Sequence, residues 1–416
     1  MFGPIVRHCV AAFCLDLSVI LVQTAAPFFI LHHLDGGVSE SSSTGAAMSI
    51  TYGGVCIAGT LIIGRVRKGV ALAGLGAALS GACMAFAGSA PGVFVFGALV
   101  TGALGSVGLS WPSMHAWLGA EPDSSRRATL MARYNMSWSF GMAIAALVAG
   151  PLFETDPGLP FTVAAVCAGL AALLLFLQPH ERDFFGAASH PVPLELDSAG
   201  PLGEAFLYPT WLACFTGWSL LGACRYMFPK RVDEVAEAGV LTMFPWSTET
   251  VTFGAPTVFS VLAFGLTATS VAVFYVMGRR QGWIHRMGVL FGLQCVAAAA
   301  LWVLGTTESF AVMFLCFSLI GINSYAIFFA SLFYSMANLR LKGRRASINE
   351  GIVGGGGFAG SLIFGWIAAE YTLSTPFLFA PIAVLGSVAV QGLLLRWLLG
   401  RIRPAKAAVD LVDSVD

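Results

Sequence analysis

The chain has 416 residues, of which 57% are apolar and only 11% charged, and its mean hydropathy is +0.80. Soluble domains of this length do not carry so large an apolar fraction, so the composition indicates a polytopic membrane protein. Lysine plus arginine equals aspartate plus glutamate at 22 each. The bulk charge therefore predicts neither nucleic acid nor an acidic protein as a partner. The nine cysteines lie in apolar segments without a CxxC pair, which indicates packing rather than a disulfide framework or a metal site.

Apolar runs of about 20 residues divide the chain into twelve predicted transmembrane helices, so the expected fold class is an all-α polytopic membrane protein. The runs are 9–31, 45–65, 69–88, 91–118, 128–152, 159–178, 209–228, 251–277, 286–304, 308–337, 346–370 and 376–399. The first run is too long for a cleaved signal peptide and contains Asp16, so we interpret it as a retained span.

Basic residues gather in the loops on one side of the predicted spans. They are Arg65, Arg67, Lys68, Arg126, Arg127, Arg279, Arg280, Arg286, Arg340, Lys342, Arg344, Arg345, Arg401, Arg403 and Lys406. The loops on the opposite side hold only Lys230 and Arg231, among acidic residues. Because short cytoplasmic loops are enriched in lysine and arginine, the pattern predicts that both termini are cytoplasmic, in a plasma (inner) membrane.

The two halves of the chain share a spaced pattern. Gln23-x3-Pro27 near the start reappears as Arg225-x3-Pro229, an offset of 202 residues, and Gly64-Arg65 reappears as Gly278-Arg279. An internal duplication in one orientation is the parallel-repeat plan of a large class of transporters. We therefore predict two pseudo-symmetric six-helix bundles. The predicted ranges are 1–178 for the N-terminal bundle, 179–208 for a cytoplasmic linker, 209–400 for the C-terminal bundle and 401–416 for a cytoplasmic tail.

The loop after the second span carries a family motif in modified form. Residues 59–68 read GTLIIGRVRK, against G-x-L-x-D-R-x-G-R-K in the major facilitator superfamily (MFS), and the chain resembles that family over essentially its whole length. The resemblance implies the MFS fold, two rocking halves, and a gating role for Arg67 and Lys68 of the motif. Ile63 stands at the motif's acidic position, so the acidic side chain of the family's charged contact between spans two and eleven is missing. Residues 95–108 contain no charge, unlike the fourth span of the family's proton-coupled drug exporters.

Arg225 follows an almost uncharged apolar run, at a depth where the sequence indicates membrane. A charge inside a spanning helix is costly and usually functional. If Arg225 and its counterpart Gln23 face a central cavity, the guanidinium can bind a carboxylate or a phosphate. The alternative is that Arg225 reaches out of the membrane toward Lys230 and Arg231.

Two acidic residues and a histidine are candidates for ion coupling or gating. Asp16 can accept a proton or a cation, or it can form a structural ion pair with Arg133 or Arg345. Glu350 follows Arg345 by about one helical turn and is expected in the same gate network. His115 closes the fourth span, where it serves either as a proton relay or as a hydrogen-bonded interfacial residue.

Four further side chains are candidate cavity residues. Asn135 and Trp138 lie one turn apart in the fifth span, and Asn323 and Tyr325 lie in the tenth. Each can either contact the solute or make a helix–helix contact inside the bundle.

These patterns predict a secondary transporter that moves a small solute, with organic anions favoured, by rocker-switch alternating access. The alternatives are lipid or drug efflux on the same fold, or a membrane sensor or enzyme that does not transport. Walker, His-Glu-x-x-His and Gly-x-Ser-x-Gly motifs are absent, so we expect no enzyme activity, no cofactor and no metal. The expected partners are a small molecule, a coupled H+ or Na+ and the lipid bilayer. We expect a monomer that binds no nucleic acid.

Overall fold

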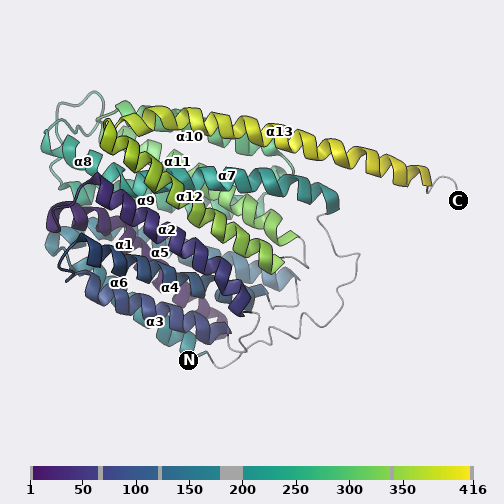
Figure 1. Cartoon of the computed structure of the whole chain (residues 1–416), viewed down its shortest axis with the longest axis horizontal. Helices are drawn as coiled ribbons and strands as arrows, with labels where there is room; N and C mark the ends of the chain where they lie inside the picture. The colour runs from purple at the N-terminus through teal and green to yellow at the C-terminus, as the bar shows by residue number, and fades with distance from the viewer. Residues whose placement is uncertain (1–2, 64–68, 120–123, 179–199, 338–341, 413–416) are drawn as a thin grey trace.

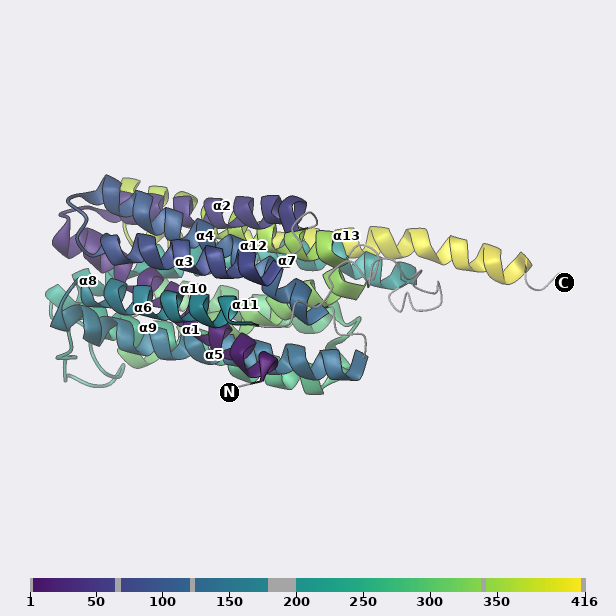
Figure 2. The same cartoon turned by 90° about the horizontal axis from the view of Figure 1, so that it is seen from below.

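The computed structural model describes residues 3–63, 69–119, 124–178, 200–337 and 342–412, and in those ranges the chain is almost wholly helical (Figure 1). Twelve helices there have at least 18 residues and run side by side in one elongated bundle (Figures 1 and 2). They are α1 (Pro4–Phe28), α2 (Val38–Ile63), α3 (Gly69–Ala87), α4 (Val93–Gly119), α5 (Ser124–Thr155), α6 (Leu159–Phe176), α7 (Gly200–Tyr226), α9 (Ala255–Arg279), α10 (Met287–Thr306), α11 (Phe310–Ala337), α12 (Lys342–Glu370) and α13 (Thr375–Val412). The π-helical turn η1 (Phe29–His33), the short helix α8 (Phe228–Glu237) and the 3-10 turn η3 (Gln281–Trp283) complete the described elements.

Ten of the twelve long helices are apolar and long enough to cross a membrane, counting only the described residues. The other two, α2 and α7, carry more polar side chains. Helix α2 is rich in serine and threonine, and α7 has Arg225 in its last turn. Both helices lie at the centre of the bundle, where they pack on α12 from opposite halves of the chain. Their polar side chains therefore face protein and an internal cavity rather than lipid, which explains their lower hydropathy.

Two helices extend well beyond their predicted bounds, and one loop contains a further short helix. Helix α7 begins at Gly200, so residues 200–208 of the predicted linker are helical. Helix α13 continues to Val412, into the predicted tail, where a run of alanine and lysine favours a helix. The loop after α7 contains the amphipathic helix α8, as its sequence suggests.

Packing within the first six long helices is repeated within the last six. The pairs α1–α5, α1–α6, α2–α4, α3–α4 and α3–α6 have as counterparts α7–α12, α7–α13, α9–α11, α10–α11 and α10–α13, and all ten pairs are in contact. The two seams between the halves, α2–α12 and α5–α9, are counterparts as well. This correspondence is what a duplicated six-helix unit with a pseudo-twofold axis produces.

Small residues bring the halves into close contact along both seams. A methyl group added to Gly53 of α2 would lie 3.1 Å from the Cα atom of Gly354 in α12. On the other seam, the backbone of Gly150 in α5 lies against the carbonyl of Pro256 at the start of α9. Such contacts let helix backbones pack directly on one another, without intervening side chains.

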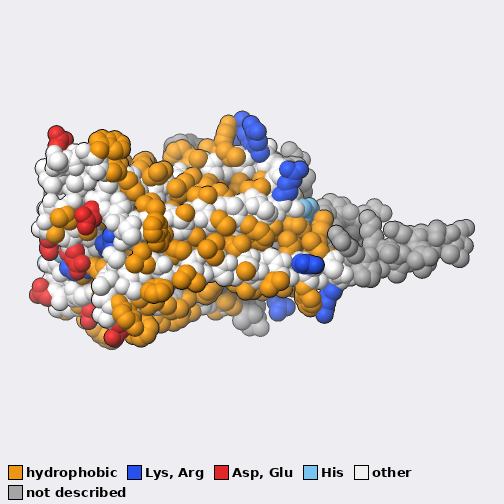
Figure 3. Space-filling view, turned by 90° about the horizontal axis from the view of Figure 1, so that it is seen from above, with side chains coloured by type: hydrophobic (Ala, Val, Ile, Leu, Met, Phe, Trp, Pro, Cys, Tyr) orange, Lys and Arg blue, Asp and Glu red, His pale blue; other side chains and the backbone are white. Residues whose placement is uncertain are grey.

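The bundle has two ends of different charge. One end, here called the α8 face, carries α8 and the loops before α2 and α9; the other, the terminal face, carries the first residues of α1 and the last turns of α13 (Figures 1 and 2). Red acidic side chains gather at the α8 face and blue basic ones at the terminal face (Figure 3). The described acids at the α8 face are Asp35, Glu40, Glu154, Asp156, Asp233, Glu234, Glu237, Glu249, Glu308 and Glu370. The described arginines at the terminal face include Arg133, Arg279, Arg280, Arg286, Arg344, Arg345, Arg396 and Arg401.

A buried amide pair joins two outer helices of the second half. Gln294 of α10 and Gln391 of α13 exchange hydrogen bonds of 3.0 and 2.8 Å, and Gln391 also donates to Ser387. Replacing Gln391 with leucine leaves the amide of Gln294 without that partner, and we expect a loss of about 1 kcal/mol of stability. Thermal unfolding in detergent checks this. The double variant Gln294→Leu/Gln391→Leu should regain most of the loss, and a double variant as unstable as the single one would contradict the explanation.

Candidate functional site

A cavity of about 130 Å³ lies between the two halves and is lined by α1, α2, α4, α5, α7, α11 and α12. Its polar and aromatic lining comprises Asp16, Gln23, Ser49, Tyr52, Trp111, His115, Tyr134, Asn135, Trp138, Trp218, Arg225, Tyr226 and Glu350. Aliphatic and phenyl side chains such as Leu104, Leu332 and Phe328 fill the rest of the wall. The cavity is therefore amphipathic, with charged groups set among apolar surfaces.

Arg225 and Gln23 meet at one end of this cavity. Arg225 Nη1 donates a 2.9 Å hydrogen bond to Gln23 Oε1, so the two counterparts of the sequence repeat join the halves directly. Arg225 Nη2 is buried without a hydrogen-bond partner among the described residues, and the guanidinium lies 5.7 Å from the ring centre of Trp218. Arg225 therefore faces the cavity and does not reach out toward Lys230 and Arg231.

The carboxyl groups of Asp16 and Glu350 lie on the terminal side of the Arg225–Gln23 pair. Asp16 is only 8% exposed, and its Oδ2 has no hydrogen-bond partner in the described part of the chain. Glu350 accepts a 2.8 Å hydrogen bond from the hydroxyl of Tyr52 in α2. The two arginines considered as partners lie elsewhere: Arg345 is paired with Glu204 at 2.6 Å, and Arg133 is exposed.

The α4 and α5 side of the cavity is built from ring contacts. The imidazole of His115 packs edge-on against Tyr134, with ring centres 5.4 Å apart. Asn135 Oδ1 accepts a 3.1 Å hydrogen bond from Trp138 Nε1, and Trp138 packs against Phe274 of α9 across the seam. His115, Asn135 and Trp138 all line the cavity.

Two candidates on α11 lie outside the cavity lining. Asn323 is buried, with Oδ1 unpartnered among the described residues, and Tyr325 packs edge-on against Phe274 with its hydroxyl 4.0 Å from the sulfur of Met142. Phe328 and Leu332 line the cavity from α11. Tyr325 shares their helix face but lies about one turn nearer the α8 face, where its hydroxyl interacts with the guanidinium of Arg225. Arg67 and Lys68 lie outside the residues that the structure describes.

Sequence reasoning missed six aromatic residues of the site: Tyr52, Trp111, Tyr134, Trp218, Tyr226 and Phe328. Aromatic side chains in an apolar helix have the same sequence signature whether they face lipid, protein or a cavity. Trp218 did carry one usable signal, because it precedes Arg225 by seven residues, about two helical turns, on the same helix face.

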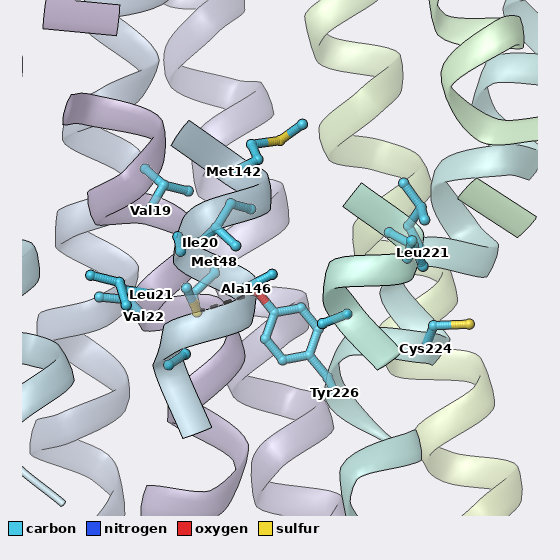
Figure 4. Close-up of a cluster of buried hydrophobic side chains, with 14 of the residues drawn as sticks. Val19, Ile20, Leu21, Val22, Met48, Met142, Ala146, Leu221, Cys224 and Tyr226 are labelled. Atoms are coloured by element: carbon cyan, nitrogen blue, oxygen red, sulfur yellow. Dashed lines mark hydrogen bonds between the residues drawn. The ribbon is translucent and has the colours of Figure 1, made fainter. Parts of the chain in front are cut away.

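Tyr226 closes the cavity toward the α8 face. Its ring reaches from the end of α7 toward Met48 of α2, with the hydroxyl 3.8 Å from the methionine sulfur (Figure 4). The ring lies directly over Gly45, and Ser41 Oγ donates a 2.8 Å hydrogen bond to the carbonyl of Tyr226. From this floor the cavity extends toward the terminal face, where His115 and Glu350 lie.

A second connection between the halves lies at the α8 face itself. His32 in the π-helical turn η1 forms a 2.9 Å contact with Asp233 Oδ1 of α8, and Lys230 lies 3.3 Å from Asp233 Oδ2. We call these three residues the α8 latch. The neighbouring Arg231 holds α8 in place through Ser374 and the carbonyl of Thr307. Isolated π-helical turns are frequent at functional sites, and η1 at the end of α1 carries His32 of this contact.

The α8 latch should weaken in acid. Burial acts to raise the pKa of Asp233, but the hydrogen bonds and charges of His32 and Lys230 outweigh it and hold this pKa below the usual carboxyl value. A lowered pKa means that the carboxylate stabilises the closed latch above about pH 4 and that this stabilisation is lost as the pH falls through the lowered value. Asp233→Asn should therefore reduce the melting temperature at pH 7 but not below about pH 3. Glu234→Gln, an exposed neighbour with the same charge change, should leave the profile unaltered. Parallel profiles for Asp233→Asn and the unmodified protein would refute the latch.

Two helical halves in the same orientation around a central amphipathic cavity are the arrangement of one large class of membrane transporters. The sequence profile of the Major Facilitator Superfamily matches residues 9–349, and the chain belongs to this family. A comparison with curated proteins finds no match.

Solved structures of the same fold include several transporters. The POT family transporter PepTSo has a TM-score of 0.71 at 13% identity, with 96% of this chain and 99% of that one covered. The nucleoside transporter NupG has a TM-score of 0.66 at 12% identity, covering 94% and 99% of the two chains. The human organic anion transporter MFSD10 (TETRAN) has a TM-score of 0.63 at 15% identity, covering 95% and 100%. At these identities the likeness concerns the fold alone.

Proposed function

We propose that the protein is a secondary active transporter that moves small organic anions by rocker-switch alternating access. The single observation that carries the proposal is the half-buried Arg225 guanidinium between the halves, with Nη1 bonded to Gln23 and Nη2 shielded from solvent without a geometric hydrogen bond to any described residue. An arginine in this setting is costly unless it binds an anion, and its planar donors suit a carboxylate or a phosphate. The neutral amide of Gln23 adds a second polar group to the same subsite. Asn135 and Trp138 extend the binding surface across α5.

The orientation follows from the charged ends of the bundle. Arginines gather at the terminal face and acids at the α8 face, so we place the terminal face in the cytoplasm, with both termini there, in the plasma (inner) membrane (Figure 3). The cavity is closed at Tyr226 and the α8 latch and extends toward the terminal face. The present conformation is then inward-facing. The predicted ranges 1–178 and 209–400 are the two rocking bodies, acting within a monomer.

Coupling to an ion is assigned to the carboxyl groups of the cavity. Asp16 and Glu350 are buried and no ion pair with a basic side chain joins either of them among the described residues, so either can take up H+ or a cation during the cycle. His115 lies between these groups and the terminal face and suits a proton relay. The Arg345–Glu204 ion pair at the terminal end of α7 and α12 is assigned to the gate.

Drug or lipid efflux is the second candidate. The three tryptophans of the cavity, Trp111, Trp138 and Trp218, favour it because flat aromatic walls bind diverse apolar bodies. An efflux pump of this kind would accept apolar cations or neutral compounds as readily as anions. Arg225 and Gln23 favour the anion transporter.

Counterflow in proteoliposomes tests the proposal and separates it from its rivals. Vesicles loaded with an unlabelled compound should accumulate its labelled form from outside without any added energy source. We expect saturable counterflow for monocarboxylates or for amphipathic compounds that carry a carboxylate. Accumulation of neutral drugs or lipids alone would support efflux, and ligand binding without counterflow would support a sensor; either result would overturn the anion transporter.

A further inference from the structure

We infer that the solute is a zwitterion, an amphipathic amine that also carries a carboxylate, bound lengthwise between Arg225 and the carboxyl groups of Asp16 and Glu350. This inference rests on the proposed transport function and refines its substrate class. It depends on the acidic pole of the cavity, which the proposed function uses only for ion coupling.

The cavity has two poles of opposite charge. Gln23, which binds Arg225, and Asp16 are seven residues apart on α1, so they share one helix face and are separated by about 10 Å along its axis. Glu350 of α12, Tyr134 of α5 and Arg225 all lie within electrostatic range of Asp16. The distance suits a small molecule with one charged group at each end.

Each pole presents an atom with no partner among the described residues. At the basic pole this atom is Arg225 Nη2. At the acidic pole it is Asp16 Oδ2, in a residue that is only 8% exposed. An uncompensated charge inside a membrane protein is strongly unfavourable, so both atoms are expected to meet a ligand or a proton. The basic residue within electrostatic range of Asp16 is Arg225, whereas Arg345 is paired with Glu204 and Arg133 is exposed.

The walls at the acidic pole suit an organic ammonium group. The rings of Trp111 and Tyr134 meet edge to face with centres 6.5 Å apart, and Tyr52 donates its hydroxyl proton to Glu350. Aromatic faces beside carboxylates attract organic cations and bind the alkyl groups around them. Among the described residues there is no group of three or more His, Cys, Asp and Glu side chains that would hold a metal ion. An amine is therefore a better match for this pole than a divalent metal.

Binding a zwitterion would neutralise both poles at once. An anion that lacks the amine would pair with Arg225 but leave the Asp16 carboxylate unpaired, unless that carboxyl takes a proton. If a zwitterion is the solute, it must carry an amine to pair with Asp16. If Asp16 takes up a proton instead, the solute needs only its anionic group. A comparison of matched solutes therefore decides between them.

The experiment uses the full-length protein in proteoliposomes with three matched sets of compounds. The sets are phenylalanine, 3-phenylpropionate and 2-phenylethylamine; 4-aminobutyrate, butyrate and butylamine; and dialanine with its des-amino and decarboxylated analogues. In at least one set we expect the zwitterion to be transported at least about tenfold better than both partners, the loss associated with one missing charged contact. Asp16→Asn should reduce the preference for zwitterion over anion to about threefold or less, while Arg225→Gln should do the same for zwitterion over amine.

Each other outcome has a defined meaning. Equal transport of zwitterion and des-amino anion by the unmodified protein would overturn this inference and leave the anion transporter standing, with Asp16 a proton site. Transport of none of the nine compounds would overturn both. The comparison among solutes needs no variant, so a failure of Asp16→Asn to fold would not remove the test.

Discussion

Arg225→Gln should lower the transport of a carboxylate-bearing solute by about a hundredfold. The variant keeps a polar side chain of similar length but loses the charge and the planar fork of donors, and truncating one partner of a buried charged pair commonly costs about 3 kcal/mol. Arg225→Lys keeps the charge but not the planar fork of donors, so its transport rate should lie between those of the unmodified protein and Arg225→Gln. Initial rates of counterflow and the dissociation constant of the solute, measured on the same preparation, check this expectation.

The matched control for Arg225 is an arginine at the terminal face. Arg279 is exposed and stacks on Tyr275 at 4.5 Å, outside the cavity, so Arg279→Gln makes the same chemical change without touching the site. It should leave both quantities within about twofold. Equal losses of transport in the two variants would indicate a general effect of positive charge. Normal transport by Arg225→Gln would contradict an anion subsite at Arg225.

Gly150→Leu should hold the protein open at the α8 face and abolish net transport. The added side chain would enter the carbonyl of Pro256 at the start of α9, where the two halves touch. The Gly150 amide also donates a 2.5 Å hydrogen bond to Ser260 Oγ, which depends on the same close approach. Because this seam lies between the rocking bodies and not within one of them, the variant should fold and still bind solute from the α8 face. Labelling of a cysteine placed in the cavity, with reagent added from the α8 side, should rise severalfold.

Gly169 provides the control for Gly150. It lies in α6 with open space around the position of a Cβ atom, so Gly169→Leu should transport at close to the normal rate. If Gly150→Leu moved solute normally, the α5–α9 seam would not be an interface that must close.

The sequence predicted the plan of the molecule and singled out two residues that the structure brings together. Long apolar runs place the helices, because a membrane imposes their length. The repeat at an offset of 202 residues singled out Gln23 and Arg225, and the structure joins these two side chains at 2.9 Å. A pseudo-twofold relation brings counterpart positions to the same depth, which is why the pairing was visible in the sequence.

What the sequence missed depends on helix rotation and on partners far apart in the chain. Asn323 is a polar residue of α11 that lies away from the face carrying Phe328 and Leu332, and only packing decides that rotation. Tyr325 shares the face of Phe328 and Leu332 but lies about one turn nearer the α8 face, beside Arg225. Glu350 was expected near Arg345, its neighbour by one turn, yet it binds Tyr52 of the other half.

The α8 latch was missed for the same reason. His32 and Asp233 are 201 residues apart in the chain, and only the packing of the two halves brings them together. Neither has a sequence motif around it that would distinguish a contact between the halves from two separate exposed side chains.

Distances across the two faces of the bundle, with and without solute, test the central claim most directly. Spin labels can be placed on exposed positions in a variant without the nine cysteines: Asp156 with Ala238 across the α8 face, and Arg133 with Arg280 across the terminal face. Alternating access predicts reciprocal changes in double electron–electron resonance, with one distance population lengthening as the other shortens when solute is added. Distances that stay fixed, or that lengthen together, would contradict a transporter whose halves rock about the Arg225 cavity.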